Sequence, residues 1–150
     1  MAFEFEHSVE CPVARDFAWR FWADVSNWPT VDPSVEAARL DGPFAAGTKG
    51  TTKPRGLPPT QWTLVEVREG RSAVIEVSAP GAVLRFGWVF EDAAGGGTRM
   101  IQKVSLEGAR AGEYAEGMKG LEAGIPAGMR GLAAAMSRAA GESRTGVSEA

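Results

Sequence analysis

The stretch DFAWRFWADVSNWPTVDP, residues 16–33, carries three tryptophans and two phenylalanines in eighteen residues and ends with two prolines. Its first half has apolar residues at helical spacing, namely Phe17, Ala18, Phe21, Trp22 and Val25. Trp28-Pro29 breaks this pattern, and Asp32-Pro33 marks a turn. The segment therefore predicts a short helix, a second short helical turn and a reversal of the chain.

The segment lies between stretches with strand periodicity. Before it, residues 3–10 alternate strictly between apolar and polar, which predicts a half-buried strand. After it, six strands separated by turn signals are expected near residues 34–40, 47–54, 61–68, 72–78, 82–91 and 98–107. The connections between them are too short for helical crossovers, so the sheet is predicted to be antiparallel.

Two of these strands show which side chains face inward. The strand expected near residues 82–91 has Leu84, Phe86, Trp88 and Phe90 on its inner face. The strand expected near residues 98–107 has Met100, Gln102, Val104 and Leu106 on its inner face. Gln102 is therefore a polar side chain in an apolar row, and a buried amide needs a hydrogen-bond partner. A ligand carbonyl or hydroxyl, the backbone, or water would each serve.

The last segment changes to helical periodicity. Its apolar residues, spaced 4, 3, 4, 4, 3 and 4 apart, are Tyr114, Met118, Leu121, Ile125, Met129, Leu132 and Met136. They predict one face of a long helix, which Pro126 should kink or restart. Residues 141–150, GESRTGVSEA, predict a flexible tail after a domain of residues 1–140.

This order of elements predicts an α+β fold. We expect a curved antiparallel sheet of about seven strands wrapped around the long C-terminal helix, with two short helices after the first strand. The rings of the first helix plug the wide end of the sheet, and Trp28-Pro29 fixes the turn that returns the chain to it.

The stretch CPVARDFAWRFWADVSNWPTVDP, residues 11–33, resembles the START-like helix-grip superfamily of the birch pollen allergen. It is most similar to the SRPBCC polyketide cyclase/dehydrase-type branch, with matching landmarks at Asp24, Trp28, Pro29 and Pro33. Segments 42–50, 79–81 and 95–100 fit as well, so the resemblance covers residues 3–140. The resemblance implies the helix-grip fold and ligand binding as the first function to expect. An enzyme that cyclises or dehydrates a polyketide-like substrate is the alternative, and it needs no cofactor. The chain departs from the family at its last helix, which Pro126 and several glycines interrupt.

Composition narrows the function classes. The chain has 150 residues, 44% of them hydrophobic, and no run long enough to span a bilayer, so we expect one globular domain. The single cysteine, Cys11, excludes an internal disulfide, and one cysteine with one histidine does not make a metal-ligand set. A net charge of −3 argues against nucleic acid as a partner. The absence of a secretory signal favours a cytoplasmic location, and the Gly- and Ala-rich composition favours a bacterial source.

A ligand pocket is expected between the sheet and the C-terminal helix, open near the proline-rich loop of residues 54–60. Its predicted lining is Trp62, Phe86, Trp88, Gln102, Tyr114, Met118 and Met129. Weak candidates for catalysis are His7, Gln102 and Tyr114.

These candidates also have structural interpretations. His7 would suit a general base, but a neutral histidine bonded in the core is the preferred interpretation. Tyr114 would donate to a ligand oxygen or simply pack in the core. Lys53 and Arg55 would bind an anionic head group or belong to a solvated loop, which we prefer, and Arg85 is expected to face outward.

A second stripe on the helix consists of Gly117, Gly120, Gly124, Gly128 and Gly131. An interior glycine costs about 1 kcal/mol relative to alanine, so the stripe calls for a reason. It would allow close packing on the sheet, leave room for a ligand, or admit a second helix in a dimer, and we favour the first two. Compositional drift in a GC-rich genome is the alternative that gives the stripe no structural role.

The sequence therefore predicts a domain that binds a hydrophobic, lipid- or polyketide-like small molecule, as a monomer or homodimer. A polyketide cyclase/dehydrase-type enzyme using the same cavity is one alternative. A protein-interaction module with a filled core is the other.

Overall fold

The computed structural model describes the backbone of residues 2–149 and the side chains of residues 3–141. Within them, seven strands form one antiparallel sheet in the order β1-β7-β6-β5-β4-β3-β2. The strands are β1 (Ala2–Cys11), β2 (Val35–Leu40), β3 (Lys49–Pro54), β4 (Thr60–Arg68), β5 (Ser72–Ala79), β6 (Ala82–Asp92) and β7 (Thr98–Glu107). The predicted strand positions are confirmed to within two residues, because alternation and turn residues both mark them.

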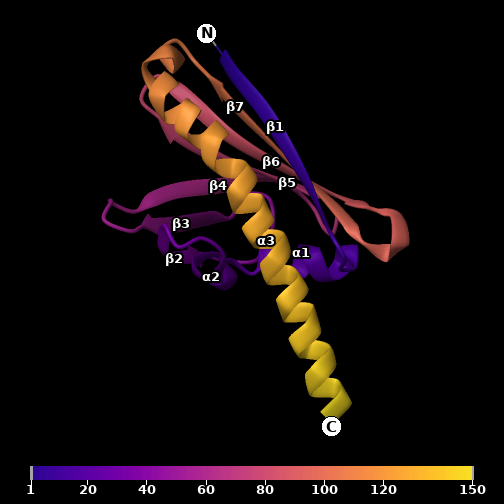
Figure 1. Ribbon diagram of the computed structural model, residues 1–150. Coiled ribbons are helices and arrows are strands. Elements are labelled where there is room, and N and C mark those ends of the chain that lie inside the picture. The colour runs from indigo at the N-terminus through magenta and orange to yellow at the C-terminus, as the bar shows by residue number, and fades with distance from the viewer. Residues whose placement is uncertain (1, 150) are drawn as a thin grey trace.

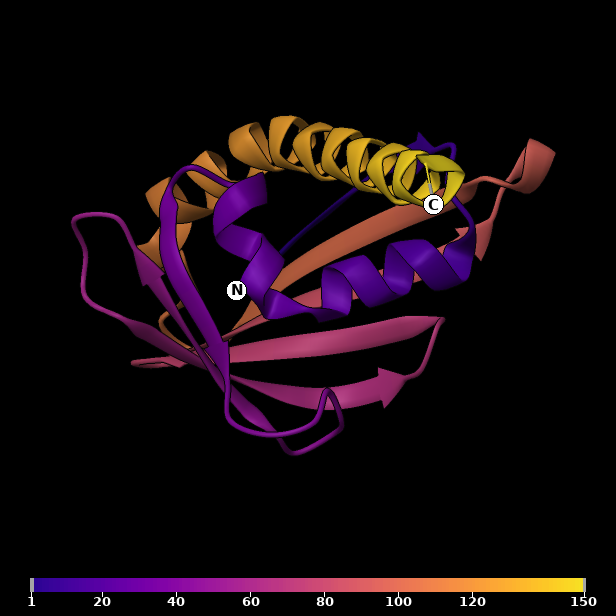
Figure 2. The same ribbon diagram turned by 90° about the horizontal axis from the view of Figure 1, so that it is seen from below.

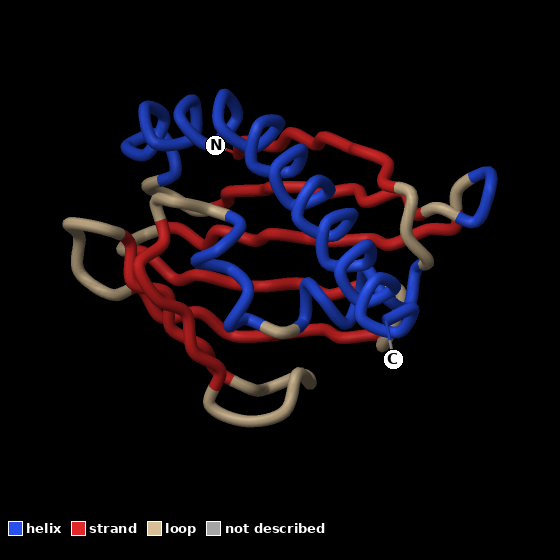
Figure 3. Tube along the Cα trace, turned by 60° about the horizontal axis from the view of Figure 1, so that its bottom comes forward, coloured by secondary structure: helices blue, strands red, loops and turns tan. Residues whose placement is uncertain are grey.

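The helices are segregated to one face of this sheet (Figure 1). They are α1 (Arg15–Ala23), α2 (Trp28–Val31) and α3 (Ala115–Glu149), with short 3₁₀ turns η1 (Val25–Asn27), η2 (Ala94–Gly96) and η3 (Ala111–Tyr114). In Figure 2, α3 arches over the concave face of the sheet, with α1 and α2 on the same side. Figure 3 shows α3 crossing the strands diagonally. The predicted helix-grip architecture is confirmed.

The long helix α3 continues through Pro126 instead of restarting there. Of the predicted inner stripe, Met118, Met129, Leu132 and Met136 are buried, and Tyr114, Leu121 and Ile125 are half-buried. The helix extends to Glu149, past residue 140, where the sequence analysis ended the domain. That residues 141–150 form a flexible tail stays a prediction, and residue 150 lies outside the described residues.

The glycine stripe of α3 faces away from the sheet. A Cβ added at Gly117, Gly120, Gly124 or Gly128 would meet no atom within 4 Å, and all four residues are exposed. Only at Gly131 does such a Cβ approach another element, at 3.6 Å from the Val31 carbonyl oxygen. Our preference for close packing or pocket space is therefore wrong for the first four glycines. The larger Met/Leu stripe sets the rotation of the helix, and that rotation turns these glycines outward.

The tryptophan-rich segment closes one end of the core. Trp19 and Trp22 are buried and lie 5.4 Å from the ring of Phe90. The Trp28 ring stacks on Trp62 at 5.4 Å, and its indole N–H donates to the Trp22 carbonyl oxygen at 2.8 Å. The rings of α1 and α2 are thereby fixed against β4 and β6, as the sequence predicts for a plug at the end of the sheet.

Candidate functional site

The core between the sheet and α3 is divided into two clusters of buried side chains. The first, here called the ring cluster, includes Trp19, Trp22, Trp62, Leu64, Ile75, Trp88, Phe90, Met100, Met129, Leu132 and Met136. The second, the β7 cluster, consists of Ala82, Val104, Leu106, Ala111 and Met118. Phe86 and Ile125 are half-buried and pack against both. We call the inner face around these two residues the junction.

Apolar side chains near the junction keep part of their surface accessible. Besides Phe86 and Ile125, the half-buried residues packed on the β7 cluster are Phe3, Phe5, Leu84, Tyr114 and Leu121. They come from β1, β6, η3 and the start of α3, so they lie along the helix–sheet interface. Accessible apolar surface in this position is available for burial against a ligand.

Three side chains with hydrogen-bonding groups form a row across the sheet beside the junction. His7 on β1 lies opposite Gln102 on β7, and Gln102 lies opposite Trp88 on β6. Residues paired in this way project from the same face of the sheet. Met100, two residues before Gln102, belongs to the ring cluster, and Val104, two residues after it, belongs to the β7 cluster. Gln102 therefore occupies the boundary between the clusters.

The side-chain amide of Gln102 is buried without a protein partner. Gln102 is 7% exposed, and among the described residues its amide makes no side-chain hydrogen bond. In the same part of the chain, Arg15 Nε is the only polar side-chain atom both sealed from solvent and unpartnered. The amide atoms of Gln102 consequently border space that a water molecule can reach.

The other predicted lining residues separate into two groups. Trp88, Trp62 and Met129 belong to the ring cluster, whereas Met118 belongs to the β7 cluster. Trp62 stacks on Trp28 and donates its indole N–H to the Thr52 hydroxyl at 2.9 Å. The structure therefore brings Trp88 next to Gln102 on the neighbouring strand, and places Trp62 and Met118 in different clusters.

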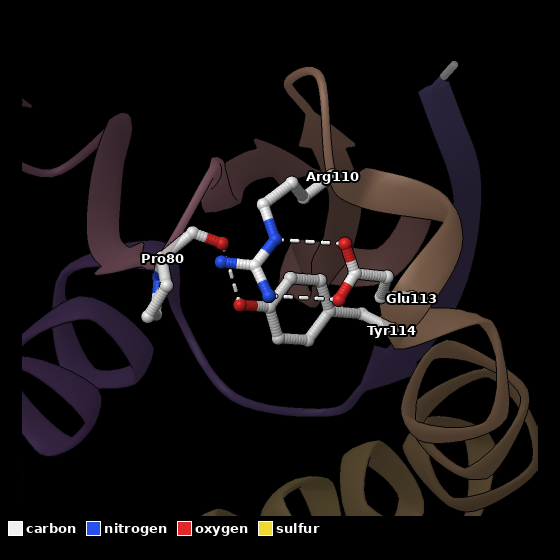
Figure 4. A network of polar contacts seen from close by, with 4 residues as sticks. All are labelled: Pro80, Arg110, Glu113 and Tyr114. Atoms are coloured by element: carbon white, nitrogen blue, oxygen red, sulfur yellow. Dashed lines mark hydrogen bonds and ion pairs between the residues drawn. The ribbon is translucent and has the colours of Figure 1, made fainter.

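Tyr114 takes part in a polar network that ties the β5–β6 turn to η3 (Figure 4). Its hydroxyl donates to the Pro80 carbonyl oxygen at 2.7 Å, while the Arg110 backbone N–H donates to Gly81. The Arg110 guanidinium binds both carboxylate oxygens of Glu113, at 2.7 and 2.8 Å, and lowers the pKa of Glu113. The network connects η3 to the β5–β6 turn at the end of the helix–sheet interface next to the β7 cluster. The Tyr114 hydroxyl already donates its hydrogen bond within this network.

The proline-rich loop is anchored to the segment that follows α2. Lys53 pairs with Glu36 at 3.0 Å and lowers the pKa of that carboxyl. The Arg55 side chain donates to the Pro33 carbonyl oxygen at 3.2 Å, and its backbone N–H donates to Ser34. Both cations thus have protein partners, which favours the preferred interpretation of a structural, solvated loop. Arg85 faces outward as expected and pairs with Glu76 and Glu107 on the neighbouring strands.

His7 and Cys11, the only histidine and the only cysteine, do not form part of a cluster of metal-ligating side chains within the described residues. His7 is half-buried, and Cys11 is buried, so burial raises the pKa of the Cys11 thiol. Across residues 3–141, no three His, Cys, Asp or Glu side chains gather closely enough to hold a metal ion.

A surface depression that the sequence analysis did not anticipate lies between the end of β1 and the β6–β7 hairpin. Its volume is about 280 Å³, and its walls are Glu10, Cys11, Pro12, Ala93, Ala94, Gly95 and Gly97. The glycine-rich turn was the available signal, since Gly95 and Gly96 adopt positive φ and leave this hairpin without bulky side chains. Glu10 is the only charged residue in its walls.

Residues 2–137 match the family model described as polyketide cyclase / dehydrase and lipid transport. The chain belongs to this family. The match confirms the resemblance stated from residues 11–33, and it spans every strand and most of α3. A search of the curated proteins found no match.

Solved structures similar to this polyketide cyclase / dehydrase family member share its fold at low identity. Zhui aromatase/cyclase from Streptomyces sp. R1128 is 15% identical over 92% of this chain and 95% of its own, with a TM-score of 0.74. Norcoclaurine synthase from Thalictrum flavum is 12% identical over 93% and 87%, with a TM-score of 0.71. Ara h 8.0201 is 15% identical over 91% and 98%, with a TM-score of 0.68. At these identities the likeness concerns the fold alone.

The family landmarks near the N-terminus have structural roles in this chain. Asp24 caps η1 by accepting from the Ser26 backbone N–H at 3.1 Å. Pro29 lies in the first turn of α2, where its missing N–H is not needed, and Pro33 accepts from Arg55. These contacts account for the landmarks as features of the fold. Among the described residues, no helix is long and apolar enough to cross a membrane.

Proposed function

We propose that this member of the polyketide cyclase / dehydrase and lipid transport family binds a hydrophobic small molecule, lipid-like or polyketide-like, between the sheet and α3. The observation that carries the proposal is the junction, where Phe86 and Ile125 contact two core clusters and remain half-buried. An apolar ligand lying there removes this surface from water, at about 25 cal/mol per Å² of apolar area.

The ligand-contacting residues follow from their distance along the sheet from the junction. Phe86, Trp88 and Gln102 are the central contacts, because they adjoin it on β6 and β7. The outer contacts, which a longer ligand reaches, are Trp62 and Met129 in the ring cluster and Met118 and Tyr114 beside the β7 cluster. The proposal includes a cytoplasmic monomer or homodimer that acts without nucleic acid, metal or cofactor.

The test is to fill the junction with a side chain. Ile125→Trp places an indole beside Phe86, whereas Leu57→Trp adds the same ring to a loop residue that is 61% exposed. Binding is measured with 1-anilinonaphthalene-8-sulfonate fluorescence, and near-ultraviolet circular dichroism checks that each variant retains its fold. We expect Ile125→Trp to weaken binding at least tenfold and Leu57→Trp to leave it unchanged.

Two outcomes contradict this proposal. If the folded wild-type protein binds neither this dye nor any of a panel of fatty acids and polycyclic aromatics, the core is filled and the interaction-module alternative gains support. If Ile125→Trp binds as well as wild type, the ligand lies elsewhere. Native mass spectrometry of protein from its own host then identifies any bound small molecule.

A cyclase/dehydrase-type reaction at the same junction is the second candidate. The observation that favours it is His7, a half-buried titratable side chain opposite Gln102. As a general base it would contribute about 10²–10⁴-fold, so His7→Gln should reduce turnover by that factor while binding persists. Turnover unaffected by changes at His7, Gln102 and Tyr114 alike contradicts the enzymatic alternative.

A further inference from the structure

Among the described residues, the protein supplies no hydrogen-bond partner to the side-chain amide of Gln102. A primary amide offers two N–H donors and an acceptor oxygen, and burial without partners is unfavourable. Gln102 is 7% exposed and lies between Met100 and Val104, both fully buried. Neither neighbour on its own strand can satisfy the amide, because both side chains lack strong donors and acceptors.

The paired residues on the adjacent strands do not satisfy it either. His7 and Trp88 flank Gln102 on β1 and β6, and all three side chains lack hydrogen bonds within the described residues. By contrast, the buried Thr98 hydroxyl donates to the Val13 carbonyl oxygen at 2.7 Å, and the indole N–H of buried Trp62 donates to the Thr52 hydroxyl. Three side chains without a hydrogen bond to the protein thus lie in one row beside the junction, and water or a ligand can supply the partner of Gln102.

We infer that the ligand carries a hydroxyl or carbonyl oxygen that hydrogen-bonds to the side-chain amide of Gln102, so that Gln102 selects oxygen-bearing apolar molecules over pure hydrocarbons. The inference rests on the proposed function and names the chemistry of its ligand. A carbonyl accepts from the amide N–H, and a hydroxyl can accept from the N–H or donate to the amide oxygen. The apolar body of the ligand lies against Phe86 and Ile125.

The expected discrimination follows from the net value of one hydrogen bond. Such a bond corresponds to about a threefold to tenfold difference in affinity. Two probes of equal ring size isolate it, namely 2-naphthol and naphthalene. Gln102→Met removes the amide while keeping the length of the side chain, and Met100→Leu is the matched control two residues away on the same inner face.

The experiment measures displacement of 1-anilinonaphthalene-8-sulfonate by each probe from wild type, Gln102→Met and Met100→Leu. We expect the preference for 2-naphthol over naphthalene to be about threefold to tenfold larger in wild type and Met100→Leu than in Gln102→Met. Without ligand, Gln102→Met should melt about 2–4 °C higher, because an unpartnered amide has left the core. In wild type, the Gln102 side-chain NH₂ resonance, assigned by its loss in Gln102→Met, should move with 2-naphthol and much less with naphthalene.

Each outcome bears on a separate claim. If both probes bind and the preference is the same in wild type and Gln102→Met, the selective role of Gln102 is overturned while ligand binding stands. If the amide resonance responds equally to both probes, the oxygen contact is overturned as well. If neither probe displaces the dye from the folded wild-type protein, the proposed function fails, and this inference with it.

Discussion

Replacing Gly120, Gly124 and Gly128 by alanine should make the protein more stable. All three are exposed interior positions of α3, and an added Cβ meets no atom within 4 Å. Each change therefore gains the intrinsic helix preference of alanine, about 0.8–1 kcal/mol, without a steric penalty. The triple variant should gain about 2–3 kcal/mol, which is the sum of the three propensity differences.

Urea denaturation followed by far-ultraviolet circular dichroism measures this gain. The midpoint should rise while the m-value stays constant, and the melting temperature should increase by about 5–10 °C. Ligand affinity should not change, because these glycines face away from the junction. An unchanged or lower stability would falsify the exposed placement of the stripe. If the variant also dissociates from dimer to monomer on a sizing column, a second copy covers this face.

Three further changes test other parts of the structure. Gly50→Ala should destabilise the protein by about 1–3 kcal/mol in urea melts, because its Cβ would overlap the Trp62 ring; equal stability refutes that packing. Iodoacetamide should alkylate Cys11 far more slowly in the native than in the urea-unfolded protein, because burial shields the thiol and raises its pKa; equal rates contradict this. Arg110 lowers the pKa of Glu113 below 4.5, so the pair stabilises the fold above that pH and loses its effect as pH falls through the folded pKa. In Glu113→Gln, the loss of stability on acidification at low salt should be slightly smaller than in wild type, as measured by urea melts at several pH values. An identical dependence of stability on pH in the two proteins contradicts a stabilising role of the pair.

Alternation along the chain predicts the face to which each strand residue belongs. Met100, Gln102, Val104 and Leu106 are all buried, as their period of two requires. The turn at Trp28-Pro29 is equally local, because proline fixes its own backbone and suits the first turn of α2. Most of the fold follows from such short-range rules, applied strand by strand.

The division of the core could not be predicted in this way. Trp62 and Met118 both face inward, yet they lie in different clusters, because the position of a side chain along α3 or across the sheet depends on long-range packing. The glycine spacing is ambiguous for a similar reason. A helical stripe shows which residues share a face, and only the competing Met/Leu stripe decides whether that face meets the sheet or solvent.

The pairing of β1 with β7 has a consequence for how the chain assembles during synthesis. Ala2 lies opposite Glu107, so the first strand leaves the ribosome about 100 residues before the partner it needs. At about 5–20 residues per second it waits roughly 5–20 s with the apolar side chains of Phe3 and Phe5 uncovered. The consecutive hairpins from β2 to β6 can form meanwhile from local contacts, and β1 joins the sheet last, once β7 has paired with β6. Glu4 and Glu6, which alternate with the two phenylalanines, place charge along this waiting strand and disfavour its pairing with another nascent chain.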